Sequence, residues 1–138
     1  MTIRRRERER GSITVELVIL TPVVGLLLAS VVLVGRVQTA RADVEGAARS
    51  AARELSIARS PAAAVPTATT AAHATLDVGS PPCRTMGFTP TITASTVTVT
   101  VSCLIDLRAA SVLPVPASMT VSATATEVID TYREAAGP

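Results

Sequence analysis

The chain is poor in aromatic and reactive side chains. Its 138 residues include no tryptophan, one tyrosine, one phenylalanine and one histidine, and every basic residue is arginine. With no aromatic platform on which bases could stack and a net charge of +2, nucleic-acid binding is not expected. The phosphate-binding, serine-hydrolase, zinc-protease and dinucleotide-binding motifs are also missing. The sequence therefore predicts a protein that is not an enzyme and that takes no cofactor and no small-molecule substrate.

The N-terminus joins a basic leader to a long apolar run. Five arginines and two glutamates lie within residues 4–10, and Leu17–Val34 carries no charge. An uncharged run of about 18 residues is long enough to cross a bilayer as a helix. The alternative is a cleaved secretory signal, whose apolar region would be about 7–15 residues long and end close to a small-residue cleavage site. The nearest such site, Ala40–Ala42, lies well beyond the run, so a retained transmembrane helix is predicted.

The flanking charges predict how this helix is oriented. The leader is strongly basic, whereas on the far side Arg36 and Arg41 are closely followed by Asp43 and Glu45. Positively charged flanks favour the cytoplasm. We therefore expect a single-pass membrane protein with a cytoplasmic N-terminus and with the residues after about Arg36 outside.

One carboxylate, Glu16, lies just inside the apolar boundary. Most charged side chains cost on the order of 2.5–3.5 kcal/mol at the bilayer centre and less near its edge, so such a residue is by default a functional candidate. The alternative is that Glu16 extends to the lipid headgroups and only marks the edge of the membrane.

Gly11 and Glu16, placed between an arginine-rich leader and an apolar helix, resemble the type III signal of type IV pilins and pseudopilins. Within that superfamily, Arg10–Leu17 and the later Gly35–Arg36 resemble the TadE-like proteins of the tight-adherence (Tad) pilus system. Many members have phenylalanine where this chain has Leu17, which is a conservative difference. The resemblance extends over roughly residues 6–60.

The resemblance implies a processing step and an assembly contact. A membrane-embedded prepilin peptidase would cut after Gly11, removing residues 1–11 and leaving Ser12 with an amino group that is cationic at neutral pH. Glu16, one helical turn away, would then pair with the amino terminus of a neighbouring subunit, because a carboxylate in lipid is tolerable when paired.

The implied function is that of a minor pilin or pseudopilin in the bacterial plasma membrane. Its partners would be the prepilin peptidase, other pilins or pseudopilins, the pilus assembly platform and membrane lipid. A minor component is expected because the family's major pilins are shorter and lack a sheet domain. The alternative is an uncleaved single-pass anchor that displays a small disulfide-bonded binding domain.

Beyond the membrane segment, residues 12–35, a helical pattern continues over residues 36–59. Apolar residues recur there at steps of three and four, which predicts an amphipathic helix with an alanine-rich stripe: Val37, Ala40, Val44, Ala47, Ala48, Ala51, Leu55 and Ala58. A continuous helix from Ser12 to Arg59 would be about 70 Å long. Pro22 and Gly25 are expected to loosen it locally.

The remaining residues predict a connector, a small sheet and a tail. Residues 60–87 are punctuated by prolines and are expected to form a connector and loop, with a short helix around Thr67–Leu76. Alternation within residues 88–130 predicts three strands, with a tight connection near Ser95 and a crossing loop over Asp106–Ala117. Residues 131–138 are expected to be a polar tail. The predicted fold is α+β and pilin-like: a long transmembrane helix continuing into an amphipathic helix, packed on a three-stranded antiparallel sheet.

The chain has two cysteines, Cys83 and Cys103, and both lie outside the membrane on this topology. Such a pair in a small extracytoplasmic domain predicts a disulfide. Closing a loop of about 20 residues is worth roughly 3 kcal/mol in the chain-entropy model. Two free buried thiols are the alternative. No metal site is expected, because two cysteines and a distant His73 do not supply four ligands, and His73 is interpreted as an ordinary surface or half-buried side chain.

Overall fold

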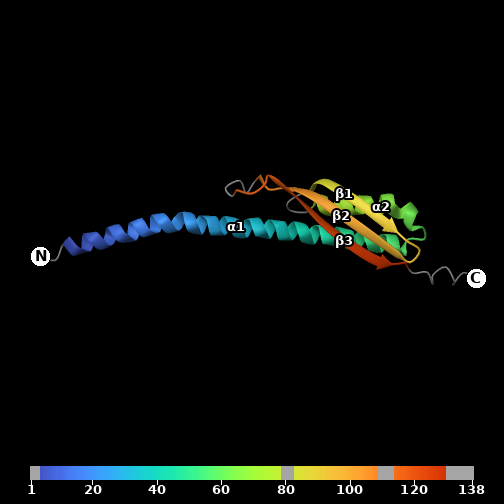
Figure 1. Ribbon diagram of the computed structural model, residues 1–138, viewed down its shortest axis with the longest axis horizontal. Coiled ribbons are helices and arrows are strands. Elements are labelled where there is room, and N and C mark those ends of the chain that lie inside the picture. Colours follow the sequence, from blue (N-terminus) through green and yellow to red (C-terminus); the bar gives the residue numbers. More distant parts are fainter. Residues whose placement is uncertain (1–3, 79–82, 109–113, 130–138) are drawn as a thin grey trace, which may run out of the picture.

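The computed structural model describes residues 4–78, 83–108 and 114–129, with side chains described from Val15 onward. The elements follow in the order α1 (Arg4–Ile57), α2 (Pro61–Asp77), β1 (Cys83–Ile92), β2 (Thr96–Asp106) and β3 (Ser118–Val128). Figure 1 shows α1 as a long rod whose C-terminal half carries the other elements and whose N-terminal half projects from them. The predicted α+β architecture, with one long apolar helix and a three-stranded antiparallel sheet, is confirmed. The predicted tail, residues 131–138, lies outside the described residues.

Helix α1 runs without interruption for 54 residues, a length of about 80 Å. Its second half buries the alanine-rich stripe, whose central members are at most 3% exposed: Ala40, Val44, Ala47, Ala48, Ala51 and Leu55. Alanine favours the helix, and its small side chain allows close packing. The exposed ion pair between Glu45 and Arg49 (Oε2 to Nη2, 3.0 Å) contributes at most about 0.5 kcal/mol. Packing of the stripe therefore stabilises this half of the helix.

The predicted connector contains a full second helix. The sequence predicts only a short helix around Thr67–Leu76, whereas α2 begins at Pro61. A proline in the first helical turn loses no hydrogen bond, and the carbonyl of Ser60 accepts the first main-chain bonds of α2, both at 3.1 Å. Pro66 removes one bond inside the helix. Burial of Ala68, Ala72 and Leu76 offsets that loss, so tertiary packing overrides the local proline signal.

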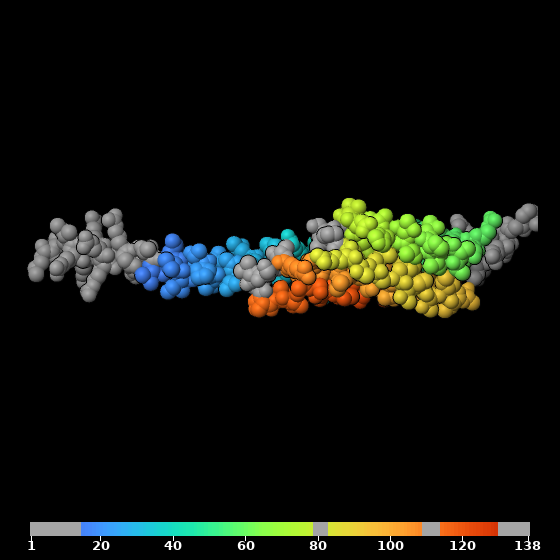
Figure 2. All heavy atoms as spheres, turned by 90° about the horizontal axis from the view of Figure 1, so that it is seen from above, coloured from blue at the N-terminus to red at the C-terminus, as the bar shows by residue number. Residues whose placement is uncertain are grey.

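The sheet has the order β1-β2-β3, and both pairings are antiparallel. The β1–β2 hairpin closes at Ile92 and Val97, and β2 pairs with β3 from Thr96–Val128 to Asp106–Ser118. Alternate residues of β2 are buried, each at most 2% exposed: Val97, Val99, Val101, Cys103 and Ile105. Helix α1 contacts β2 and β3, and α2 contacts α1 and β1, so both helices lie on one face of the sheet (Figures 1 and 2).

The other face of the sheet carries hydroxyl groups. Thr98 and Thr100 of β2 are hydrogen-bonded through their Oγ1 atoms to Thr126 and Thr124 of β3, at 2.9 and 3.0 Å. Cross-strand threonine pairs of this kind contribute roughly 0.2–1 kcal/mol each. The period of two in the sequence thus separates an apolar face toward the helices from a hydroxyl-bearing face toward solvent.

Because the alanine stripe packs closely against the sheet, the free energy of unfolding should fall when a larger side chain is introduced there. We expect Ala51→Leu to lower the free energy of unfolding by about 1–3 kcal/mol, because Ala51 is fully buried in the stripe. Ala42→Leu makes the same change at an exposed position of α1 and should alter stability by less than about 0.5 kcal/mol. Pulse proteolysis of detergent-solubilised protein across a urea series measures both variants. Equal stability of the two would contradict the packing described here.

Candidate functional site

The candidate site is the projecting half of α1. Its large apolar side chains, from Val15 to Val34, are mostly 49–69% exposed. Among the described residues, α1 is the single helix that is long and apolar enough to cross a membrane. Its most apolar 18-residue window has a mean hydropathy of 2.8, and no residue in that window is buried. Water does not tolerate so large a continuous apolar surface. A run of about 18 residues is about 27 Å long, close to the roughly 30 Å of a bilayer core. This half of α1 is suited to be a membrane anchor.

Hydroxyl groups inside the apolar run are satisfied within the helix. Thr21 donates its Oγ1 proton to the carbonyl of Leu17 at 2.7 Å, and Ser30 donates to the carbonyl of Leu26 at 2.8 Å. Such bonds allow polar side chains to sit in lipid without an external partner. The helix also continues through Pro22 with no break, so the expected local loosening does not interrupt it.

The residues singled out from the sequence lie near the N-terminal end of this helix. The main chains of Gly11, Ser12 and Glu16 are helical. The side chain of Glu16 is exposed, and no ion pair involves it among the described side chains. The side chain of Ser12 lies outside the described residues. The chain itself therefore offers Glu16 no described cationic partner.

Cys83 and Cys103 form the expected disulfide, with their Cα atoms 5.5 Å apart. The bridge joins two strands, whereas a link from a loop to a strand was expected, because β1 already begins at Cys83. The alternation of Met86, Phe88 and Pro90, which all lie on the partly buried face, was the sequence signal for this longer strand.

The disulfide closes an irregular end of the sheet. The β1–β2 register shifts between Cys83 and Thr85, so Arg84 is the extra residue of a bulge. Arg84 forms an ion pair with Asp106, and the second oxygen of that carboxylate accepts the main-chain N–H of Arg108 at 2.8 Å. The bulge and these contacts could not be expected from the sequence, because no local pattern marks them. Together they hold the end of the sheet from which the β2–β3 connection departs.

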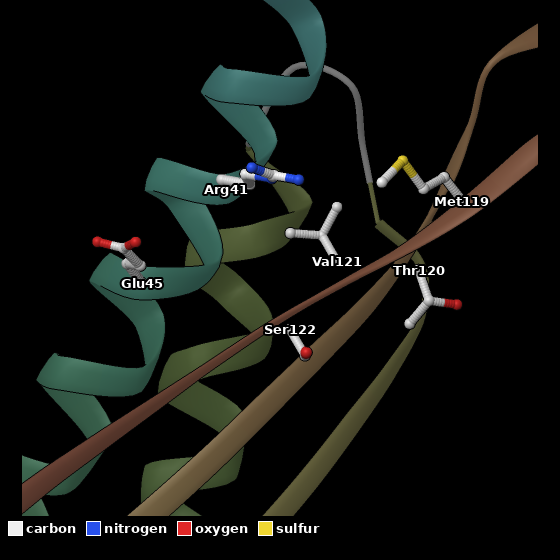
Figure 3. Close-up of a pocket in the computed structure, with 6 residues that line it drawn as sticks. All are labelled: Arg41, Glu45, Met119, Thr120, Val121 and Ser122. Atoms are coloured by element: carbon white, nitrogen blue, oxygen red, sulfur yellow. The ribbon is translucent and has the colours of Figure 1, made fainter.

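A shallow groove of about 340 Å³ lies between α1 and the start of β3. Arg41 extends from α1 toward Val121, while the carboxylate of Glu45 points the other way (Figure 3). Met119, Thr120 and Ser122 complete the lining. The groove could not be expected from the sequence, because its lining residues are distant in the chain.

The ionisable residues of the described part of the chain are dispersed. It contains no group of three or more histidine, cysteine, aspartate or glutamate side chains placed to hold a metal ion. His73 is exposed on α2, where its Nδ1 lies 3.0 Å from Oδ2 of Asp77 one turn later.

The disulfide gives a direct chemical prediction. Trypsin cleaves after Arg59, Arg84 and Arg108, so non-reducing digestion should release Ser60–Arg84 covalently joined to Thr85–Arg108. Reduction should separate the two peptides and lower the free energy of unfolding by about 3 kcal/mol, because the loop between the cysteines is freed in the unfolded state. Mass spectrometry and pulse proteolysis measure the two effects. Labelling of both thiols in folded, unreduced protein would contradict the bridge.

Comparison with known proteins identifies the first part of the chain. Residues 11–53 match the family model described as TadE-like protein. No curated protein and no solved structure matches the chain. The matched segment begins at Gly11, includes Glu16 and the whole projecting apolar run, and ends within the buried stripe of α1; the sheet lies outside it. The TadE-like resemblance inferred from the sequence is thus confirmed over the first helix of the chain, which is also the candidate membrane span.

Proposed function

We propose that the protein is a minor pilin or pseudopilin of a tight-adherence or type IV-like pilus. The observation that carries this proposal is the division of α1 into two halves. One half offers an exposed, uncharged surface to lipid or to other helices, and the other half is the core helix of a folded domain. The TadE-like match over residues 11–53 supports the association with a pilus. The basic leader supports a cytoplasmic N-terminus.

Processing would take place at Gly11. A prepilin peptidase that cuts after this residue removes the basic leader and leaves the apolar helix at the start of the mature chain. The backbone of α1 is helical at this point, so it has to open locally to enter a peptidase. Glycine favours that opening, because it stabilises a helix less than alanine does by about 1 kcal/mol.

Assembly would use Glu16 and the amino group of Ser12. Ser12 and Glu16 are separated by four residues, or about 6 Å along a helix. A neighbouring subunit displaced by about one helical turn would therefore place its cationic amino terminus level with Glu16. Gly25 and Gly35 support close approach of helices, because small residues allow membrane helices to pack with their backbones near one another. A methyl group at either glycine would meet no atom within 4 Å of its own chain.

The rival function is an uncleaved anchor that displays the sheet domain as a binding module. Its support is the open, hydroxyl-bearing face of the sheet. In that case Gly11 and Glu16 would have no role beyond the membrane edge, so variants at these two positions separate the two functions.

The processing step predicts a defined mature N-terminus. Mass spectrometry of protein purified from native membranes should find a chain that begins at Ser12, and Gly11→Val should retain the leader, because a branched side chain replaces the glycine next to the cut. The control is Gly46→Val, at a glycine where a side chain meets nothing within 4 Å; it should be processed normally. Recovery of an intact leader in the native protein, or of a start after Ala42, would rule out pilin-type processing.

The assembly contact predicts a defect that is separate from processing. Glu16→Gln should be inserted and cut normally, but its recovery with other pilus components by crosslinking should fall strongly. The reason is that an unpaired buried ammonium group typically costs about 3–5 kcal/mol. Glu45→Gln, which removes only a surface ion pair with Arg49, should assemble as the unmodified protein does. Full assembly of the Glu16 variant would instead favour the simple anchor.

A further inference from the structure

The folded domain begins without a spacer after the apolar run of α1. Leu33, which lies inside that run, and Val37, just beyond Arg36, are both partly buried against the domain's core. Helix α1 is continuous through this region. When the apolar run spans a bilayer, the end of the domain that covers these residues must lie at the membrane surface, because no flexible segment separates the two.

The described residues on either side of the gap between β2 and β3, 107–108 and 114–117, lie at this end of the domain. In Figures 1 and 2 the orange segment that leads into β3 reaches back along α1, beside the part of the helix that precedes its packed half. Leu107 is 5% exposed, and its N–H donates to the carbonyl of Ala117 at 2.9 Å, which ties the two ends of the connection together. The described tip, Pro114–Pro116, is uncharged and mostly exposed. Its two prolines have no N–H group that would lose hydration on leaving water.

Three exposed arginines lie near the same end: Arg36, Arg41 and Arg108. Arg36 precedes Val37, which packs against the core, Arg41 lines the groove beside Met119, and Arg108 follows Leu107. None of the three arginines is in an ion pair within the described part of the chain. Two of the nearby carboxylates are engaged elsewhere, since Asp106 pairs with Arg84 and Glu45 pairs with Arg49. Asp43 on α1 is in no ion pair with a described side chain, so the three arginines outnumber the one free carboxylate near them. The guanidinium of Arg41 lines the groove beside β3 (Figure 3). Uncharged apolar residues with free cations near them are complementary to an anionic lipid surface.

We propose that this membrane-facing end, made of Pro114–Pro116 with Arg36, Arg41 and Arg108, rests on the bilayer and contacts anionic phospholipid headgroups. The tip lies at the level of the headgroups, and the arginines bind lipid phosphate. This contact holds the sheet domain against the membrane surface, at the height that the uninterrupted helix α1 already sets. The inference rests on the proposed membrane insertion of α1, but not on cleavage at Gly11 or on pairing of Glu16.

A lipid-quenching experiment tests the contact. The full chain is placed in vesicles of equimolar phosphatidylcholine and phosphatidylglycerol, with an environment-sensitive fluorophore on one introduced cysteine; the native cysteines are joined in the disulfide. Val115→Cys reports the tip, Leu27→Cys reports the membrane span, and Ala94→Cys, in the exposed β1–β2 hairpin at the opposite end of the sheet, reports the aqueous side. Lipid-borne quenchers should quench the Val115 and Leu27 probes severalfold more than the Ala94 probe. Pro116→Cys provides a second tip position at an exposed residue.

The probes distinguish a failure of the proposed headgroup contact from a failure of membrane insertion by α1. If the Leu27 probe is quenched while both tip probes behave like the Ala94 probe, the proposed contact is wrong and the anchor stands. If the Leu27 probe is not quenched, membrane insertion itself is wrong. In a Val115→Cys background, Arg108→Gln should reduce quenching at the tip in the mixed vesicles and change it little in pure phosphatidylcholine. Tip quenching that is insensitive to lipid charge would overturn the headgroup contact.

Discussion

The structure depends on the contact between the alanine stripe of α1 and the buried residues of β2. Small side chains on the helix let its axis lie close to the sheet, and the branched side chains of Val99 and Val101 fill the space that remains. The same helix continues, unbroken, into the projecting apolar half. Because a single rigid element is both the core of the domain and the anchor, the position of the domain above a membrane follows from its packing.

The two halves of α1 share one backbone geometry and differ in the size of their side chains. Leucine, valine and isoleucine dominate the projecting half, where they remain exposed in the isolated chain, whereas alanine dominates the half that packs on the sheet. Large apolar side chains favour transfer into lipid. Small ones favour close packing against another element. The change in composition near Arg36 therefore divides the helix by function, although nothing in its hydrogen bonding marks the boundary.

Periodic and compositional signals were reliable where many residues contributed to them. The stripe from Ala40 to Leu55 and the alternation of β2 involve repeated residues, and both lie as predicted. The predictions were weaker where one residue dominated the local pattern. Pro61 and Pro66 suggested a connector, although burial of one face of α2 outweighs the bond that Pro66 removes. The start of β1 at Cys83 was likewise missed, because a bulge interrupts its pairing there.

The sequence by itself determined the apolar run, the place of Glu16 at its edge, the two cysteines and the periodicities of the main elements, since each is a property of residues near one another in the chain. Only the tertiary structure decided that the domain abuts the apolar run and that the disulfide joins two strands next to a bulge. It also decided that Arg36, Arg41 and Arg108 lie near one end of the domain. Those features depend on which distant segments pack together. Packing is set by the summed burial of whole faces, which no local pattern records.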